Sequence, residues 1–443
     1  MKNRRYTFSL LVVGSLVMVL FIGYIHLTIN DPFEYPLNET EAFIVNDSYE
    51  IGENIKVYVH TGIGATANLT RLGKQAEVID WTHDVAPTTQ SPIFDPEKGF
   101  LWEKSFEVET ATLKPGMYVL SVKPRDESYP VNIPFIVKPK IVKKISVIAS
   151  TNTWQAYNAC GGISSYTDFR TPRYLKALYK MLGYDYLQQR FLPFSRPYPV
   201  YEELDDLCFA ADTHYSHTAR GEWVALAFLE QHGFEYGVYS DHDFAINKKI
   251  LQSDLIIFQV HTEYWSEEMR ENLKDYLDGG GHAIFLGGDN MTRDIEFYEH
   301  GIIINKKPFD RDNIEQMIGS QFSHEGFNTF APYQVMNPDH WVFDSIEIHN
   351  GDIIGEYSSN YNGKQFGASG WETDKHLGIN YQTIVLAKGQ NDKGGAHMVF
   401  TETKNSGWVF SSGSIAFAGA MFHDAVINRM MVNLINDPLK KVD

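Results

Sequence analysis

The junction at residues 259–266 constrains the fold of this chain more than any other stretch. An apolar run over residues 254–258 stops there, and an amphipathic segment over residues 267–277 follows directly. This order predicts a strand that feeds a helix. In an open α/β sheet such a junction lies at the carboxyl edge, where ligands bind. The junction carries an imidazole, a carboxylate, a phenol and an indole within five residues, so we take it as the candidate functional centre.

Strands and helices alternate along much of the C-terminal part of the chain. Repeated βα units of this kind predict a mostly parallel sheet with helices on both faces. The fold class predicted for residues 141–443 is therefore α/β. Residues 296–396 break the alternation, and we interpret them as hairpins and loops inserted over the sheet edge. The predicted strands are residues 145–149, 184–187, 236–240, 255–260 and 282–286, and the predicted helices are residues 171–182, 222–232, 267–277 and 423–435.

Residues 43–139 have a different pattern. Short segments of alternating polarity are separated by turn signals such as Pro115-Gly116, and no long helical period occurs. Even spacing of short strands is typical of a β-sandwich of the fibronectin or immunoglobulin type. This predicted domain holds no cluster of catalytic residue types. We expect it to prop the second domain, with glycan binding as the alternative role.

The first 30 residues contain an apolar run, residues 8–29, without a charged side chain. The run is long enough to cross a bilayer core, which takes ~20 residues of helix. Lys2, Arg4 and Arg5 precede it, so the positive-inside rule puts the N-terminus in the cytoplasm. The run ends in a poor cleavage site, which favours an uncleaved anchor over a signal peptide. Residues 1–30 thus predict a single-pass cell-membrane protein whose bulk is extracytoplasmic.

Composition narrows the classes of partner. A formal net charge of −18 argues against binding to nucleic acid and against docking on anionic lipid through a basic patch. The 43% of apolar residues is typical of a globular chain. The two cysteines, Cys160 and Cys208, cannot form a disulfide framework or a zinc site by themselves. Whether they pair stays open.

Two further aromatic stretches complete the candidate centre. Tyr157 follows the first predicted strand of the α/β part, so the same topological rule brings it near Glu263. Tyr198 lies in an aromatic stretch over residues 194–201. Two phenolates and a carboxylate would form a hard oxygen site, which suits Fe(III) better than zinc. The alternative is that these tyrosines are core or loop residues, which is the commoner role of a tyrosine.

Three stretches, residues 152–162, 195–198 and 261–269, together resemble the large (beta) subunit of N,N-dimethylformamidase and its wider family. The similarity spans residues 145–436. It implies a flavodoxin-like sheet of the class I glutamine-amidotransferase type and the hydrolysis of a small amide. It also implies one mononuclear iron (Fe3+) per chain, bound by two tyrosines and one glutamate. Matched by motif, these ligands are Tyr157, Tyr198 and Glu263.

The chain departs from the family pattern inside the predicted pocket. His261 and Glu263 keep the places of the family's His-Pro-Glu motif, although Thr262 replaces the proline. Asp289 stands where the family usually has asparagine, and Cys160 stands where tryptophan is expected. The identity of the substrate therefore stays open.

Other residues are candidates for handling protons or lining the pocket. His261 could act as general base or as hydrogen-bond donor to a ligand, and a purely structural histidine is the equal alternative. Glu372 could be a base delivered by the inserted region, with a structural role as the alternative. A thiol or serine mechanism is disfavoured, because Asp289 follows the strand where a nucleophile elbow would be expected. The predicted pocket residues are Asn158, Asp289, Asn290, His340 and Trp265.

Two functions follow from these features. The first is a membrane-anchored extracytoplasmic hydrolase that cleaves a non-peptide C–N bond with iron as Lewis acid. The second is a non-catalytic surface protein on the same fold that binds a glycan or another ligand. The expected partners are a small-molecule amide or glycan-like substrate and the membrane, and self-association into a homo-oligomer stays open.

Overall fold

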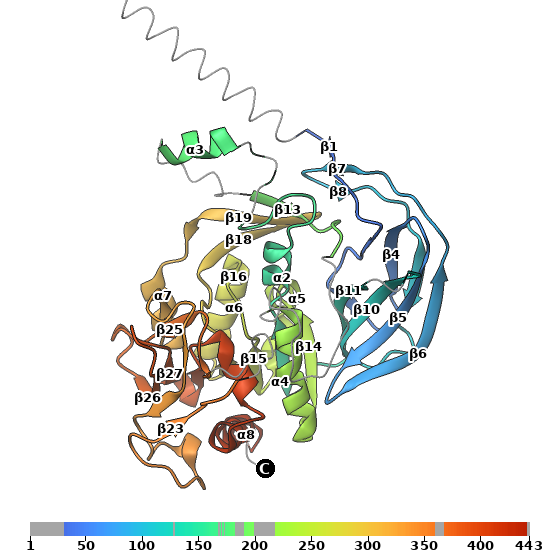
Figure 1. The fold of residues 1–443 in the computed structure, drawn as a ribbon. Helices are drawn as coiled ribbons and strands as arrows, with labels where there is room; N and C mark the ends of the chain where they lie inside the picture. The colour runs from blue at the N-terminus through green and yellow to red at the C-terminus, as the bar shows by residue number, and fades with distance from the viewer. Residues whose placement is uncertain are drawn as a thin grey trace, which may run out of the picture.

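The computed structural model describes residues 31–126, 129–166, 190–198, 218–358 and 367–440, together with residues 169, 171 and 173–181. An N-terminal β-rich part, blue in Figure 1, lies beside a C-terminal part built on a nine-stranded sheet. The predicted domain boundaries at residues 139 and 141 stay predictions.

The β-rich part follows the period-2 alternation of its sequence. In β4 (Asn54–Thr61), Ile55, Val57 and Val59 are buried while the intervening residues face outward. A five-stranded sheet, β3-β11-β10-β5-β6, and a three-stranded sheet, β2-β4-β9, enclose this core. The strands are β1 (Phe33–Glu34), β2 (Thr40–Phe43), β3 (Ser48–Glu50), β4, β5 (Ala65–Leu72), β6 (Ala76–Val85), β7 (Ile93–Asp95), β8 (Gly99–Phe100), β9 (Phe106–Glu109), β10 (Gly116–Pro124) and β11 (Val131–Lys138).

The nine-stranded sheet has the order β14-β12-β15-β17-β28-β27-β26-β22-β23. Its first five strands are parallel to one another, and every pairing from β28 to β23 is antiparallel. The strands are β12 (Ile145–Ala149), β14 (Tyr236–Ser240), β15 (Leu255–Phe258), β17 (His282–Phe285), β22 (Tyr333–Val335), β23 (Ile353–Ile354), β26 (Thr383–Gly389), β27 (His397–Glu402) and β28 (Trp408–Ser411).

The prediction of a flavodoxin-like, mostly parallel α/β fold is wrong. The described residues form 28 strands in seven sheets and only seven α-helices. Residues 296–396, predicted to lie over the sheet edge, supply β22, β23 and β26 to the sheet itself. Only residues 403–407 separate β27 from β28, which is too short for the crossover that parallel neighbours need. The added strands therefore pair antiparallel, and the sheet is mixed.

The prediction of a membrane anchor in residues 1–30 is also corrected. None of the helices in the described ranges is long and apolar enough to span a bilayer. The predicted span, residues 8–29, lies outside the described residues. The assignment to a single-pass membrane protein therefore has no support and is withdrawn.

Helices cover both faces of the parallel strands. Successive side chains of β15 point to opposite sides, with Ile257 facing α4 and α8 and Ile256 facing α6 and α7. Helix α6 begins as its sequence predicts, because the Ser266 hydroxyl accepts a hydrogen bond from the Met269 N–H. The helices are α2 (Thr151–Tyr157), α3 (Arg173–Met181), α4 (Ala219–Gln231), α5 (Asp241–Ile246), α6 (Glu267–Asp278), α7 (Arg311–Ile318) and α8 (Ala425–Leu439), with 3-10 helices η1 (Lys248–Gln252), η2 (Trp341–Phe343), η3 (Lys404–Ser406) and η4 (Ile415–Ala420).

A four-stranded sheet, β13-β19-β18-β16, lies beyond the carboxyl ends of the parallel strands, in the upper part of Figure 1. Its strand β16 comes directly from the junction that follows β15. Two further pairs of short strands, β20 with β25 and β21 with β24, are antiparallel. The strands are β13 (Arg190–Pro193), β16 (Tyr264–Trp265), β18 (Arg293–Tyr298), β19 (Gly301–Pro308), β20 (Gln321–Ser323), β21 (Phe330–Ala331), β24 (Ser369–Gly370) and β25 (Thr373–Lys375).

The two parts of the molecule share an interface built on α4. Leu72 and Met117 of the five-stranded sheet join the same core cluster as Trp223 of α4. The Trp223 indole N–H donates to the Gly73 carbonyl at 2.7 Å. Arg71 forms an ion pair with Glu230 at 2.6 Å. The β-rich part is thus fixed against the helix that covers the large sheet.

Candidate functional site

Three carboxylates and an imidazole meet at the carboxyl edge of the large sheet. His261 and Glu263 follow β15, and Asp289 follows β17, its neighbour in the sheet. Glu372 arrives from the turn between β24 and β25. Apart from Glu372, which is 13% exposed, these side chains are almost fully buried. Strand order therefore places the junction residues where the sequence predicts a functional centre.

The side chains lie close enough to act together. His261 Nε2 is 3.0 Å from Glu372 Oε2 and 3.5 Å from Glu263 Oε2. His261, Glu263 and Asp289 each offer a ligand atom, and these three atoms lie within 4.8 Å of one another. One imidazole nitrogen with two carboxylate oxygens is a donor set that suits first-row transition metals.

Three tyrosines surround the buried carboxylate of Glu263. The Tyr166 hydroxyl donates to Glu263 at 2.9 Å, and the Tyr264 hydroxyl donates to the Tyr166 oxygen at 3.2 Å. The Tyr157 ring lies 4.6 Å from the Tyr166 ring and 5.5 Å from the His261 ring, measured between centroids. Burial raises the pKa of all three phenols well above the usual value, and the charge on Glu263 adds to that effect.

The centre carries an excess of negative charge. Burial raises the pKa of Glu263 and, together with Glu263 and Glu372, holds the pKa of Asp289 well above its usual range. Burial alone would lower the pKa of His261, but the neighbouring Glu372 and Glu263 hold it above its usual value. Burial also raises the pKa of Asp374 to about 7. A cation held among these groups would stabilise the charged carboxylates and so oppose the shifts that burial and repulsion cause.

The donor atoms present fit a metal ion. Asp289 Oδ1 is buried and accepts no hydrogen bond from the described part of the chain. A buried carboxylate oxygen without a partner is costly unless something else binds it. With His261 and Glu263 beside it, that oxygen completes a three-residue set able to hold a cation.

The loop that carries Asp289 is shaped by close backbone contacts. A Cβ on Gly287 would clash with the Val260 carbonyl, and a Cβ on Gly288 would clash with the Glu372 carbonyl. Asp289 itself adopts φ 55°. The Asp374 carboxylate accepts hydrogen bonds from the Asp289 N–H at 2.7 Å and from the Asn290 amide group of the side chain at 2.6 Å. This carboxylate thus ties the Asp289 loop to the strand that follows Glu372.

Tyr198 does not join the centre. Its hydroxyl donates to Asp47 at 3.2 Å and accepts from the Gln155 amide at 3.5 Å. Its ring packs in the core of the β-rich part. The sequence prediction grouped Tyr198 with Tyr157 and Glu263, whereas in the structure Tyr166 occupies the place next to Glu263.

The motif at residues 195–198 has a structural role. The guanidinium of Arg196 is fully buried and donates to four backbone carbonyls, at 2.7 to 3.0 Å. Three of these carbonyls belong to the segment that carries Tyr157. The four acceptors are the carbonyl oxygens of Pro193, Asn158, Ile163 and Gln155.

Of the other predicted pocket residues, some brace the loops of the centre and others lie away from it. Asn290 braces the Asp289 loop, and Asn158 bonds the Pro197 carbonyl at 3.1 Å and the Cys160 N–H at 3.0 Å. Trp265 is buried in the core and donates to the Thr262 carbonyl at 2.9 Å. His340 caps η2 and packs on Phe400 with ring centroids 4.6 Å apart, close to the amino end of β28. It therefore lies away from the carboxyl edge.

Three residues of the site carried no recognised signal in the sequence. Tyr166 contacts Glu263 from a loop, Arg293 Nε donates to Glu263 Oε1 at 3.2 Å, and Asp374 braces Asp289. Arg293 and Asp374 stand four and two residues after the candidates Asp289 and Glu372, so this proximity was the only available hint. Nothing in the sequence around Tyr166 distinguishes it from the other tyrosines.

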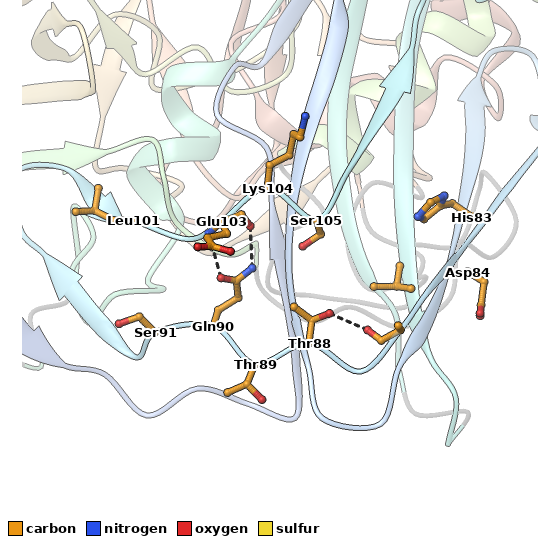
Figure 2. Close-up of a pocket in the computed structure, with 12 residues that line it drawn as sticks. His83, Asp84, Thr88, Thr89, Gln90, Ser91, Leu101, Glu103, Lys104 and Ser105 are labelled. Atoms are coloured by element: carbon orange, nitrogen blue, oxygen red, sulfur yellow. Dashed lines mark hydrogen bonds between the residues drawn. The ribbon is translucent and has the colours of Figure 1, made fainter.

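A separate cavity of about 750 Å³ lies in the β-rich part (Figure 2). Its polar walls are already engaged within the protein. The Gln90 amide donates to the Glu103 carbonyl at 2.8 Å, and Thr88 donates to the Ala86 carbonyl at 2.9 Å. Lys104 pairs with Glu107 outside the cavity. This cavity lacks the orphaned buried oxygen that marks the centre beside β15.

Comparisons with known proteins match one family. A family model described as N,N-dimethylformamidase beta subunit-like, C-terminal, matches residues 66–428, a range that includes every residue of the centre. No curated protein matches the chain.

Solved structures give only remote likenesses. An IFT52 N-terminal domain shares 11% identity at a TM-score of 0.33, covering 49% of this chain and 90% of its own. A ThuA-like protein from Bacteroides uniformis shares 14% identity at 0.34, covering 55% and 96%. A ThuA-like protein from Parabacteroides merdae shares 10% at 0.27, covering 49% and 86%. Likenesses this low support no argument about function.

Proposed function

We propose, because this chain belongs to the N,N-dimethylformamidase beta subunit-like family, that it hydrolyses the C–N bond of a small amide. The observation that carries the proposal is the buried cluster of His261, Glu263 and Asp289, whose ligand atoms lie within 4.8 Å of one another. The partner proposed is thus a small-molecule amide that reaches the carboxyl edge of the sheet.

We take iron as the metal, one ion per chain, held by His261, Glu263 and Asp289. The phenols of Tyr157 and Tyr166 lie at hand as further oxygen donors. When bound, such an ion supplies a Lewis acid that polarises an amide carbonyl. This ligand set replaces the set of Tyr157, Tyr198 and Glu263 expected from the family resemblance, because Tyr198 is committed to Asp47.

Glu372 is the group proposed to move protons, and His261, already assigned to the metal, positions it. Glu372 Oε2, 3.0 Å from His261 Nε2, accepts the proton of an attacking water and returns it to the leaving nitrogen. His261 Nε2, 3.0 Å from the same oxygen, holds that carboxylate in place. The Thr153 hydroxyl donates to the His261 carbonyl at 2.7 Å and fixes the backbone behind it.

Metal analysis of the purified full chain tests this proposal. Wild type should contain about one iron per chain, and both Glu263→Gln and Asp289→Asn should lose most of it, because each removes a charged ligand. Glu315→Gln is the matched control, since Glu315 is a buried carboxylate of α7 that bonds the Leu377 N–H at 2.8 Å. Full iron retention in both ligand variants, or a wild-type protein without metal or amidase activity, would overturn the proposal.

A further inference from the structure

We propose that Arg293 forms an anion-binding subsite beside Glu263, at the solvent-exposed edge of the centre. We propose further that the substrate is an amide that also carries a carboxylate. This inference rests on the proposed function, because it names the substrate class of the same site. The observation behind it is a half-exposed guanidinium that contacts Glu263 through one nitrogen and has no protein partner for its other two among the described residues.

The backbone places Arg293 at the boundary between the buried centre and solvent. Arg293 opens β18, where it pairs with Tyr264 in a parallel bridge, and its N–H donates to the Glu263 carbonyl at 2.9 Å. Its Nε donates to Glu263 Oε1 at 3.2 Å. The Arg293 side chain is 50% exposed, whereas that of Glu263 is 1% exposed. The guanidinium therefore spans from the buried carboxylate to the surface.

The two terminal amino groups of Arg293 have no protein partner within the described part of the chain. Two other arginines use theirs. Arg196 donates from both terminal nitrogens to backbone carbonyls, and Arg270 donates to the Trp265 carbonyl and to Asp294. An arginine whose only role was to neutralise Glu263 would be expected to donate to that carboxylate from two nitrogens, because a bidentate pair is stronger. The two terminal amino groups of Arg293 instead leave four N–H donors for a ligand at the solvent-exposed edge of the centre.

The chemistry of these donors selects the ligand. A guanidinium presents parallel N–H groups that match the two oxygens of a carboxylate, and this bidentate pair is stronger than a neutral hydrogen bond. Tyr166, which is 44% exposed, contacts the Glu263 carboxylate and places an aromatic ring beside the proposed subsite. Because Arg293 is one hydrogen bond away from Glu263, its anion must lie within a few bonds of the scissile amide. N-acyl amino acids have this arrangement of groups.

A paired-substrate experiment tests the subsite. Hydrolysis of N-formylglycine is compared with that of its neutral amide, N-formylglycinamide, in wild type, Arg293→Gln, Arg293→Lys and the control Arg311→Gln. Arg311 lies on α7, with its guanidinium over the Phe322 ring. The kcat/KM ratio of charged to neutral substrate should fall about 10- to 100-fold in Arg293→Gln, chiefly through KM, since a charged hydrogen bond is lost. It should fall less in Arg293→Lys and stay unchanged in Arg311→Gln.

A binding measurement separates this inference from the proposed function. Calorimetric titration of N-acetylglycine into the purified full chain reports the carboxylate without any need for turnover. Arg293-dependent binding in a protein that hydrolyses no amide would support the subsite and sink the hydrolase proposal. Equal hydrolysis of both formyl substrates, unchanged in Arg293→Gln, would leave the hydrolase proposal standing and overturn the subsite. Failure of N-acetylglycine to bind wild type would also overturn it.

Discussion

At the scale of single residues, Tyr166 takes the place beside Glu263 that the family resemblance assigned to Tyr198. Tyr198 matches the family motif, yet its hydroxyl is committed to Asp47 and Gln155. Tyr166 matches no motif and contacts Glu263 with both carboxylate oxygens in range, at 2.9 and 3.1 Å. A phenol has one donor to give, so the partner that it meets in the fold decides its role.

Tyr198→Phe should therefore keep its metal. The substitution removes a buried hydrogen bond in the β-rich core and should lower the free energy of unfolding by about 1 kcal/mol. Tyr333→Phe is the matched control, because that buried hydroxyl donates to the Ser412 carbonyl at 2.9 Å. Metal content and chemical denaturation measure the two effects, and loss of iron from a folded Tyr198→Phe would restore Tyr198 as a ligand.

Glu372→Gln separates proton transfer from metal binding. The substitution keeps the shape of the side chain near His261 but removes the base, which is worth about 10²- to 10⁴-fold in rate. We expect kcat to fall by that order while the iron content stays near the wild-type value. A variant with wild-type kcat would assign the proton transfer to another group.

At the scale of elements, a strap formed by β24, β25 and the turn between them closes over the loop that follows β17. Gly288 lies against the Glu372 carbonyl, and Asp374 accepts the Asp289 N–H at 2.7 Å. Trp371, beside Glu372, adopts φ 68°. The strap and the loop position each other, so two of the proposed functional groups depend on one backbone contact.

Gly288→Ala should disturb that contact. The added methyl group meets backbone rather than a flexible side chain, so we expect a loss of about 1–3 kcal/mol in the free energy of unfolding and weaker binding of iron. Gly279→Ala, at the end of α6, is the control, because its Cβ would lie 3.3 Å from its nearest neighbour, the Asp275 carbonyl. Equal behaviour of the two variants in denaturation and metal titration would contradict the proposed packing.

At the scale of the whole molecule, the β-rich part reaches the helix that carries Tyr157. Asp47, between β2 and β3, accepts a hydrogen bond from Gln155 of α2 at 3.1 Å. Burial raises the pKa of Asp47 to about 7, and the hydrogen bonds from Gln155 and Tyr198 only partly oppose this effect. The folded protein thus prefers Asp47 protonated, at the interface between its two parts.

Asp47 should make stability depend on pH. A folded pKa of about 7 lies above the usual value of 3.8, so its stabilising contribution is complete below pH ~4 and is lost as pH rises through 7. Asp47→Asn keeps the acceptor oxygen but removes the titration. The unfolding free energy of wild type relative to this variant should fall by about 1 kcal/mol per pH unit between pH 5 and 7. A difference in unfolding free energy between the two proteins that stays constant over this pH range would disprove the shift in the pKa of Asp47.

Several local features were predictable because they depend on neighbouring residues. The Ser266 cap, the start of α6 and the alternation in β4 follow from spacings of two to four residues. The position of His261 and Glu263 at a strand end follows from the same local patterns. The family was recognisable for a similar reason, since its motifs are short and contiguous in the chain.

The mixed sheet and the composition of the centre were decided only by tertiary structure. Residues 333–335 and 383–389 join the large sheet because antiparallel pairing satisfies their backbone, which periodicity alone does not reveal. The centre joins Glu263 to Asp289, Glu372 and Tyr166 from loops far apart in sequence. Spacing predicts which face a side chain takes within its own element, but the path of each loop decides what it meets there. For that reason the sequence named the junction after β15 and the candidates Asp289 and Glu372, whereas Tyr166 was found only in the structure.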